Sequence, residues 1–177
     1  MKYIILDRDG TLIEHIPYLS DENQVSLIPG AKSMIHILLN QGHFIFLHTN
    51  QSGISRGYFT IKEVERCNNK MFELLEIKKN DFKRICIAPD YPPEDDSYRK
   101  PSIKFGIEVM NKFKITQEQL FYIGDSITDL ETAHNLNCNG IGIDYYKNNK
   151  LKNDLKNNNL NFPVYNSLEE VTETILK

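Results

Sequence analysis

The segment Ile4-Ile5-Leu6-Asp7-Arg8-Asp9-Gly10-Thr11 places two carboxylates directly after a short apolar run. The aliphatic residues predict a buried strand, and the acids and the glycine predict where that strand ends. Burying a carboxylate is costly unless a cation or several hydrogen bonds compensate its charge. Because ligands of open α/β sheets bind at the carboxyl ends of the strands, Asp7 and Asp9 are candidates for a metal-binding site.

Two other interpretations of this segment have to be weighed. An Asp-x-Asp-Gly string also forms ordinary Asx turns. A calcium loop of the helix-loop-helix kind fits poorly, because its glycine occupies the sixth position, whereas Gly10 is the fourth residue counted from Asp7. Other motifs in the chain are therefore needed to distinguish an ordinary turn from a metal-binding site.

The length of 177 residues suits a single domain, residues 1–177, with a sizeable buried core. The formal net charge of −3 argues against a surface that neutralises many nucleic-acid phosphates, but leaves small anionic substrates possible. The three cysteines form no C-x-x-C pair, which favours reduced thiols. The apolar run at the N-terminus is too short for a signal peptide or a membrane span. We therefore expect a cytoplasmic monomer that binds neither membranes nor nucleic acid.

Apolar runs and amphipathic segments alternate along the chain. We expect strands at residues 3–6, 43–47, 84–88, 120–123, 139–143 and 162–165. We expect helices at residues 31–41 and about 61–77, from Pro101 to at least Met110, at 126–136 and from Ser167 to at least Ile175. The Asn- and Lys-rich residues 147–161 predict a solvated loop or a frayed helix, to which the sequence assigns no role. This alternation predicts an α/β fold with a doubly wound, mostly parallel sheet of the Rossmann-like kind, covered by helices on both faces.

Four polar pairs follow four different predicted strands. These are Asp7 and Asp9, Thr49 and Asn50, Arg99 and Lys100, and Asp125 and Asp129. In a doubly wound sheet such strand ends converge on one crevice. Carboxylate oxygens there can hold a hard cation such as Mg²⁺, while lysine, hydroxyl and amide groups can hold a phosphoryl group. Asp125 and Asp129, which we place four residues apart at the start of a helix, are also compatible with ordinary first-turn acids.

The sequence strings at these four places match a known set of motifs. They are DRDGT at residues 7–11, TN at 49–50, Lys100 before Pro101, and GDSITD at 124–129. Together they resemble the haloacid dehalogenase superfamily of phosphohydrolases, and the similarity runs from Ile4 to about Ile143.

The resemblance implies an enzyme that hydrolyses phosphomonoesters with Mg²⁺. Asp7 would be the nucleophile that forms an aspartyl-phosphate, and Asp9 the general acid and base. The resemblance also implies that Mg²⁺ is held by Asp7, Asp125 and the backbone carbonyl of Asp9.

Three further residues would bind the phosphoryl group by the same resemblance. Thr49 and the backbone N–H of Asn50 would hold its oxygens, and Lys100 would neutralise the charge that grows on them. Asp129 would support the site by orienting Lys100 or a metal-bound water.

The loops resemble one subfamily in particular. DRDGTL, TNQSGISRGYFT and RKP are similar to the phosphatases that remove the 7-phosphate from D-glycero-D-manno-heptose 1,7-bisphosphate, and to the related histidinol-phosphate phosphatases. The segment between Asp9 and His48 is too short for a large cap domain, so loops would recognise the substrate. The resemblance implies that these loops bind it through His15, Tyr18, Gln51, Ser52, Arg56 and Arg99. Arg99 could contact a second phosphate in a bidentate way, whereas Arg56 is also compatible with an ordinary surface arginine.

One feature departs from this subfamily. Its members usually carry a structural zinc bound by Cys and His just before the RKP string, but residues 87–98 contain neither residue type. We therefore expect no structural zinc. The resemblance implies that this loop helps to select the substrate, so its change bears on substrate choice.

The favoured function is therefore a phosphatase for a small phosphorylated sugar, most simply the heptose bisphosphate of cell-surface saccharide synthesis. Histidinol phosphate is the alternative substrate. A polynucleotide 3′-phosphatase is disfavoured by the acidic net charge. A catalytically silent metal- or phosphate-binding module is disfavoured because every expected catalytic position is filled.

Overall fold

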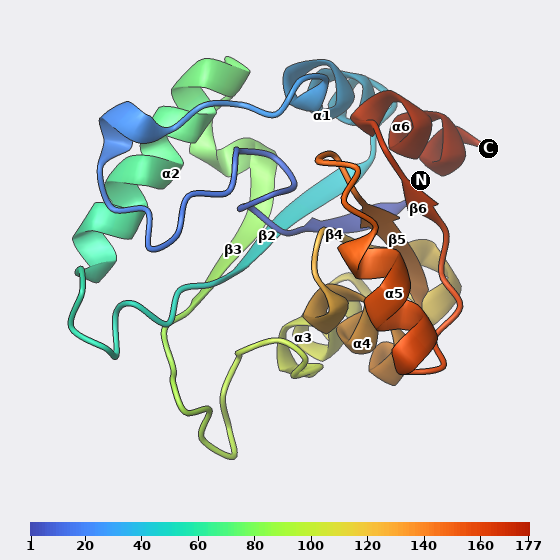
Figure 1. The fold of residues 1–177 in the computed structure, drawn as a ribbon. Helices are drawn as coiled ribbons and strands as arrows, with labels where there is room; N and C mark the ends of the chain where they lie inside the picture. The colour runs from blue at the N-terminus through green and yellow to red at the C-terminus, as the bar shows by residue number, and fades with distance from the viewer.

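A six-stranded sheet forms the centre of the computed structural model, which describes all residues 1–177 (Figure 1). The strands are β1 (Tyr3–Leu6), β2 (Phe44–Asn50), β3 (Phe82–Ala88), β4 (Leu120–Gly124), β5 (Asn139–Ile143) and β6 (Val164–Tyr165). All five pairings are parallel, in the order β3-β2-β1-β4-β5-β6. This confirms the predicted doubly wound sheet. The strand order reverses between β1 and β4, and in such sheets the ligand crevice opens at this point.

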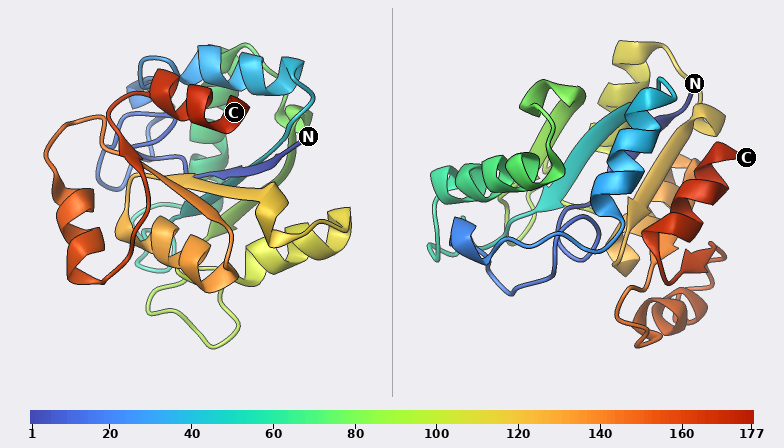
Figure 2. Two further views of the ribbon diagram at one scale, coloured as in Figure 1. Left: turned by 90° about the vertical axis from the view of Figure 1, so that its right-hand side faces the viewer. Right: turned by 90° about the horizontal axis from the view of Figure 1, so that it is seen from above.

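Helices cover both faces of the sheet, as predicted (Figure 2). They are α1 (Ala31–Asn40), α2 (Ile61–Leu75), α3 (Lys104–Phe113), α4 (Ile127–Leu136), α5 (Lys150–Asn157) and α6 (Leu168–Leu176). Short 3-10 turns occur at η1 (Glu22–Gln24), η2 (Lys79–Asp81) and η3 (Gln117–Gln119). No helix is both long and apolar enough to cross a bilayer.

The two faces of β1 belong to two different cores. Ile4 and Leu6 point into the larger core with α1, α2 and α6, whereas Tyr3 and Ile5 point into a second core with α3 and α4. Successive side chains of a strand alternate between faces, so a central strand that is covered on both sides is apolar throughout. This burial fixes β1, and with it the position at which Asp7 leaves the sheet.

Strand β2 is longer than the sequence suggested. Residues His48–Asn50, which we expected in a polar loop, continue the strand and pair with Cys86–Ala88 of β3. The sequence did not predict this extension, because its side chains are polar. A strand whose last residues belong to a polar site does not keep the apolar pattern of its first residues.

Two helix starts also differ from the prediction. Helix α3 begins at Lys104 instead of Pro101, and the Ser102 hydroxyl accepts a hydrogen bond from the Lys104 amide at 3.3 Å. Asp125 lies before the cap of α4, so the expectation that it shares the helix start with Asp129 was wrong. Ser126 is the N-cap, and both its amide and its hydroxyl donate to Asp129, at 3.1 and 2.6 Å.

The Asn- and Lys-rich segment contains an ordered helix. In α5, Leu151 and Leu155 lie one turn apart and are buried against Leu130 of α4. Two apolar residues at this spacing are enough to anchor a short amphipathic helix, although the composition around them is typical of a solvated chain.

His48 of β2 is buried without a carboxylate partner. Its Nε2 contacts the carbonyl oxygen of Tyr98 at 2.8 Å, its Nδ1 contacts the hydroxyl of Tyr122, and its ring lies against Phe105 with centroids 4.9 Å apart. Burial, with a smaller contribution from the charge of Lys100, lowers the pKa of His48 to about 3. The imidazole is therefore neutral in the folded protein.

This burial makes the stability of the protein sensitive to acid. The unfolded chain takes up the His48 proton below about pH 6.5, whereas the folded protein does not until about pH 3. Between these values, lower pH therefore decreases the free energy of unfolding, by up to about 1.4 kcal/mol per pH unit for one such group. Urea denaturation in EDTA at pH 7.5, 6 and 5 should show a steeper decrease for the wild type than for His48→Gln. Parallel pH profiles for the two proteins would contradict this explanation.

Candidate active site

A cavity of about 380 Å³ opens at the carboxyl ends of the central strands. The catalytic, phosphate-binding and metal-binding residues predicted from the sequence line it together: Asp7, Asp9, Thr49, Asn50, Lys100 and Asp125. They come from segments that are far apart in the sequence and meet because β1, β2 and β4 are neighbours in the sheet. The strand order thus produces the convergence that the sequence suggested.

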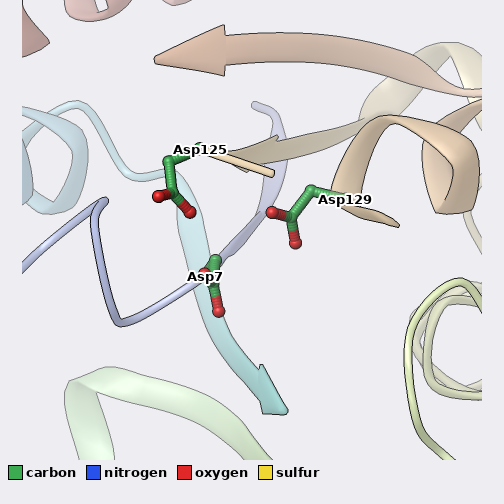
Figure 3. A group of neighbouring side chains, drawn as sticks. All are labelled: Asp7, Asp125 and Asp129. Carbon is green, nitrogen blue, oxygen red and sulfur yellow. The ribbon is translucent and has the colours of Figure 1, made fainter. Parts of the chain in front are cut away.

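Three carboxylates meet at this site, of which Asp7 and Asp125 line the cavity and Asp129 is buried behind it (Figure 3). Asp7 follows β1, Asp125 follows β4, and Asp129 lies in the first turn of α4; one oxygen from each lies within 4.8 Å of the others. Such a set of hard oxygen donors is suited to a divalent cation such as Mg²⁺. The carboxylate of Asp9 is not part of this group, and the sequence had suggested only its backbone carbonyl as a ligand.

Lys100 connects two of these acids. Its Nζ donates hydrogen bonds to Asp7 at 2.7 Å, to Asp129 at 2.6 Å and to the carbonyl oxygen of His48 at 3.1 Å. The side chain of Asn50 holds the backbone of Lys100 in place, accepting from its amide at 3.0 Å and donating to its carbonyl oxygen at 3.3 Å. The loop before Lys100 therefore ends at a fixed point.

The positive charge of Lys100 does not balance the negative charges of the carboxylates in the site. Burial raises the pKa of Asp7 to about 7, with Asp129 and Asp9 adding to the increase and Lys100 opposing it. Burial and the charge of Asp7 likewise raise the pKa of Asp125 to about 8. Burial by itself lowers the pKa of Lys100, but Asp129 and Asp7 raise it overall, so this amine stays charged. A bound cation would stabilise the ionised carboxylates, and the donor set therefore fits a divalent metal.

Both oxygens of Asp129 already have protein partners. One pairs with Lys100, and the other accepts from the amide and the hydroxyl of Ser126. Asp7 and Asp125 are less constrained. The side chain of Asp7 makes one hydrogen bond, with Lys100, and the side chain of Asp125 makes none. This difference separates a positioning carboxylate from two candidate metal ligands.

Asp9 is oriented by a residue that the sequence analysis did not identify. Arg8, which is fully buried, donates to both carboxylate oxygens of Asp9 at 3.0 Å and to Asn68 at 2.9 Å. Gln51 and Thr49 also donate to Asp9, at 2.9 and 3.2 Å. An arginine between two aspartates could have suggested such a bidentate pair, but only the fold shows that its side chain turns inward.

Only a glycine fits at position 10, next to the carboxylate of Asp125. Its φ is +79°, a conformation that L-residues rarely adopt, and a Cβ atom there would lie 2.0 Å from a carboxylate oxygen of Asp125. The glycine thus lets the chain after β1 turn beneath the carboxylate of Asp125.

The predicted substrate-binding residues separate into two places. His15, Tyr18, Gln51 and Ser52 line a second cavity of about 320 Å³, which shares Asp9, His15 and Asn50 with the first. Arg56 and Arg99 line neither cavity and lie instead on the ring of Tyr91.

The Asn- and Lys-rich segment, whose role the sequence left open, forms a wall of the first cavity. Asn148 and Lys150 line this cavity, and the hydroxyl of Tyr146 accepts a hydrogen bond from the His15 amide at 3.1 Å. Asp144 holds the turn by accepting from two successive backbone amides, at 3.1 and 2.9 Å. This proximity could not be predicted from the sequence, because nothing local to the segment requires it.

A doubly wound parallel sheet with this acidic cluster and lysine at its carboxyl edge defines a phosphohydrolase of the haloacid dehalogenase superfamily. The family model described as polynucleotide kinase 3 phosphatase matches residues 2–170, and the chain belongs to this family.

Several relatives share a more specific description. The D-glycero-D-manno-heptose-1,7-bisphosphate 7-phosphatase of Chlorobaculum tepidum is 35% identical over 143 residues, which cover 73% of this chain and 72% of the relative. The D-glycero-beta-D-manno-heptose-1,7-bisphosphate 7-phosphatase of Pseudomonas putida is 31% identical over 134 residues, with 75% and 77% covered. The crystal structure of the heptose bisphosphate phosphatase from B. bronchiseptica, complexed with magnesium and phosphate, superimposes with a TM-score of 0.85 at 24% identity and covers 99% of this chain and 98% of its own.

Removing the charge of Lys100 should destabilise the fold. In Lys100→Met, Asp7 and Asp129 lose their buried partner, and breaking a buried ion pair on one side costs about 3–5 kcal/mol. Urea denaturation in EDTA measures this loss of unfolding free energy. Lys104→Met is the matched control, because it removes an ion pair with the highly exposed Asp96 and should leave the stability nearly unchanged. Equal stabilities of the two variants would contradict the proposed role of the buried pair.

Proposed function

We propose that this protein is a Mg²⁺-dependent phosphatase that removes the 7-phosphate of D-glycero-D-manno-heptose 1,7-bisphosphate through a phosphorylated Asp7. The observation that carries the proposal is the contact between Asp7 and Lys100 at the floor of the cavity, with Asp125 beside it. The names of the relatives and their identity to this chain support the choice of substrate.

The reaction would proceed in two displacements. An oxygen of Asp7 attacks phosphorus, the bond to the ester oxygen breaks, and Asp9 gives a proton to the leaving alcohol. Water then attacks the phosphoryl group on Asp7 while Asp9 takes up its proton, so that free phosphate leaves and both aspartates return to their initial state. The hydrogen bonds from Arg8, Gln51 and Thr49 keep Asp9 oriented for both proton transfers.

The remaining residues would stabilise charge on the transferring group. Lys100 lies next to the nucleophile, and its charge would stabilise the phosphoryl oxygens, while the backbone N–H of Asn50 and the Thr49 hydroxyl, once it turns from Asp9 to the substrate, complete the phosphate site. Asp129 acts on Lys100 instead of on substrate, because its two oxygens are used by the lysine and by the cap of α4.

Mg²⁺ would be held by Asp7, Asp125 and the backbone carbonyl of Asp9. When bound, it would offset the repulsion between an anionic nucleophile and an anionic substrate. The raised pKa values of Asp7 and Asp125 support this assignment, since both carboxyls are buried with too little positive charge around them.

The sugar would occupy the second cavity. His15, Tyr18, Gln51 and Ser52 surround it and offer hydrogen-bonding groups next to aromatic surface. Arg56 and Arg99 would bind the second phosphate, the one that is not transferred.

The proposal extends to the oligomeric state, the location and the metal content of the protein. We propose a cytoplasmic monomer of a single domain, residues 1–177, that acts on small molecules and has no structural zinc. The net charge of −3 supports the choice of a small substrate over a polynucleotide. Elemental analysis of the purified protein tests the zinc assignment, and stoichiometric zinc would overturn it.

The substrate assignment is tested by a direct comparison. The kcat/KM for phosphate release with Mg²⁺ should be at least about a hundredfold higher for the heptose bisphosphate than for histidinol phosphate, because only the former carries a second phosphate for the arginines. Comparable values would leave the phosphatase chemistry in place and reject the proposed substrate, and a preference for histidinol phosphate would establish the alternative.

Asp7→Asn should abolish turnover without unfolding the protein. The amide has nearly the same shape as the carboxylate but is a poor nucleophile, so we expect phosphate release to decrease by more than about a thousandfold. The exposed Asp95 provides a matched control, and Asp95→Asn should retain full activity. Circular dichroism checks that both variants are folded. Undiminished turnover of a folded Asp7→Asn protein would reject the mechanism.

A further inference from the structure

Two arginines from different loops lie on one tyrosine ring. The guanidinium carbon of Arg56 is 3.7 Å from the ring centroid of Tyr91, and that of Arg99 is 5.4 Å from it. Arg56 belongs to the loop after β2 and Arg99 to the loop after β3, and both loops leave the sheet at the same side (Figure 1). Guanidinium groups bind to aromatic faces through cation–π attraction, so the ring connects the two loops.

No carboxylate lies within salt-bridge distance of the two arginines, although the charge of Asp90 acts to raise the pKa of Arg99. Nη1 of Arg99 is buried without a hydrogen-bond partner. Burial lowers the pKa of Arg99, and the charge of Arg56 lowers it further. Two like charges that are held together with an unused buried donor are suited to an anion with several acceptor oxygens.

Hydrogen bonds fix the loop that carries Tyr91. The hydroxyl of Ser55 donates to the carbonyl oxygen of Pro89, which joins the loop after β2 to the loop after β3. Ser97 donates to Asp90 at 2.7 Å and accepts from the amide of Arg99 at 2.9 Å. Tyr91 therefore projects from a tied loop, although 47% of its surface is exposed.

One member of the pair adjoins a residue of the reactive site in the sequence. Arg99 directly precedes Lys100, whose amine contacts Asp7. The inference requires a ligand with two anionic groups, one on the two arginines and the other, the phosphoryl group, at Asp7.

We propose that Tyr91 is a positioning residue that holds Arg56 and Arg99 together as one binding site for the second phosphate of the substrate. The proposal rests on the proposed function, which supplies a bisphosphate. In this chain the ring of Tyr91 holds the loop before Lys100 against the loop of Arg56, in the region where no zinc ligands of the Cys and His type are present.

The test compares a bisphosphate with a monoester in the full-length protein. In Tyr91→Ala, the KM for heptose bisphosphate should rise about tenfold while kcat changes by less than about twofold, because only binding of the remote phosphate is weakened. The ratio of kcat/KM for the bisphosphate to that for p-nitrophenyl phosphate should therefore fall about tenfold. Tyr91→Phe should retain the wild-type ratio, since it keeps the ring face. Glu94→Ala, an exposed residue of the same loop, is the control and should also retain it.

A double-mutant comparison shows whether Tyr91 acts through the arginines. In an Arg56→Gln background, Tyr91→Ala should raise the KM by a clearly smaller factor than in the wild type. Equal factors in both backgrounds, or an equal loss in Tyr91→Phe and Tyr91→Ala, would overturn the positioning role. A general structural defect would lower the activity on both substrates together, which would overturn it as well.

Failure of the substrate assignment can be told apart from failure of this inference. If the wild type hydrolyses p-nitrophenyl phosphate but not the heptose bisphosphate, inhibition by fructose 1,6-bisphosphate and by fructose 6-phosphate replaces the substrate comparison. Tyr91→Ala should then weaken inhibition by the bisphosphate selectively. Equal inhibition constants in wild type and variant would overturn the inference.

Discussion

The packing of three carboxylates at one strand edge, two of them bound to the buried amine of Lys100, is the constraint on which this structure depends. Asp7, Asp125 and Asp129 lie within a few ångströms of one another, and Lys100 offsets only part of their charge. Such a cluster is stable only if it is held by a rigid framework and can accept further positive charge. The same imbalance that costs folding energy makes the site suited to a divalent cation and a phosphoryl group.

The framework is supplied by the doubly wound sheet. Strand β1 is buried on both faces and pairs with β2 and β4, so the residues that follow these three strands meet at one edge. Helix α4 contributes through its cap, because Asp129 both closes the first turn and binds Lys100. Structural and chemical roles thus coincide in single residues, and next to them Gly10 leaves no room for a Cβ atom beside Asp125.

The sequence predicted the sheet, its helices and the convergence of the motif residues, because apolar periodicity and strand-end chemistry are local signals. It did not predict the partners of those residues. The inward turn of Arg8, the use of Asn50 to hold Lys100, and the placement of Tyr91 beneath two arginines all depend on contacts between distant segments. The wall formed by α5 was missed for the same reason, since its two leucines are few among asparagines and lysines.

The central claim is that Asp7 becomes covalently phosphorylated, and mass spectrometry of the protein quenched with acid during turnover tests it most directly. With p-nitrophenyl phosphate and Mg²⁺, we expect one phosphoryl group on the peptide that contains Asp7. An Asp9→Asn variant should increase its amount, because the water that hydrolyses the intermediate loses its base. Turnover without any phosphorylated peptide, in the wild type and in Asp9→Asn, would contradict the mechanism and indicate direct attack by water.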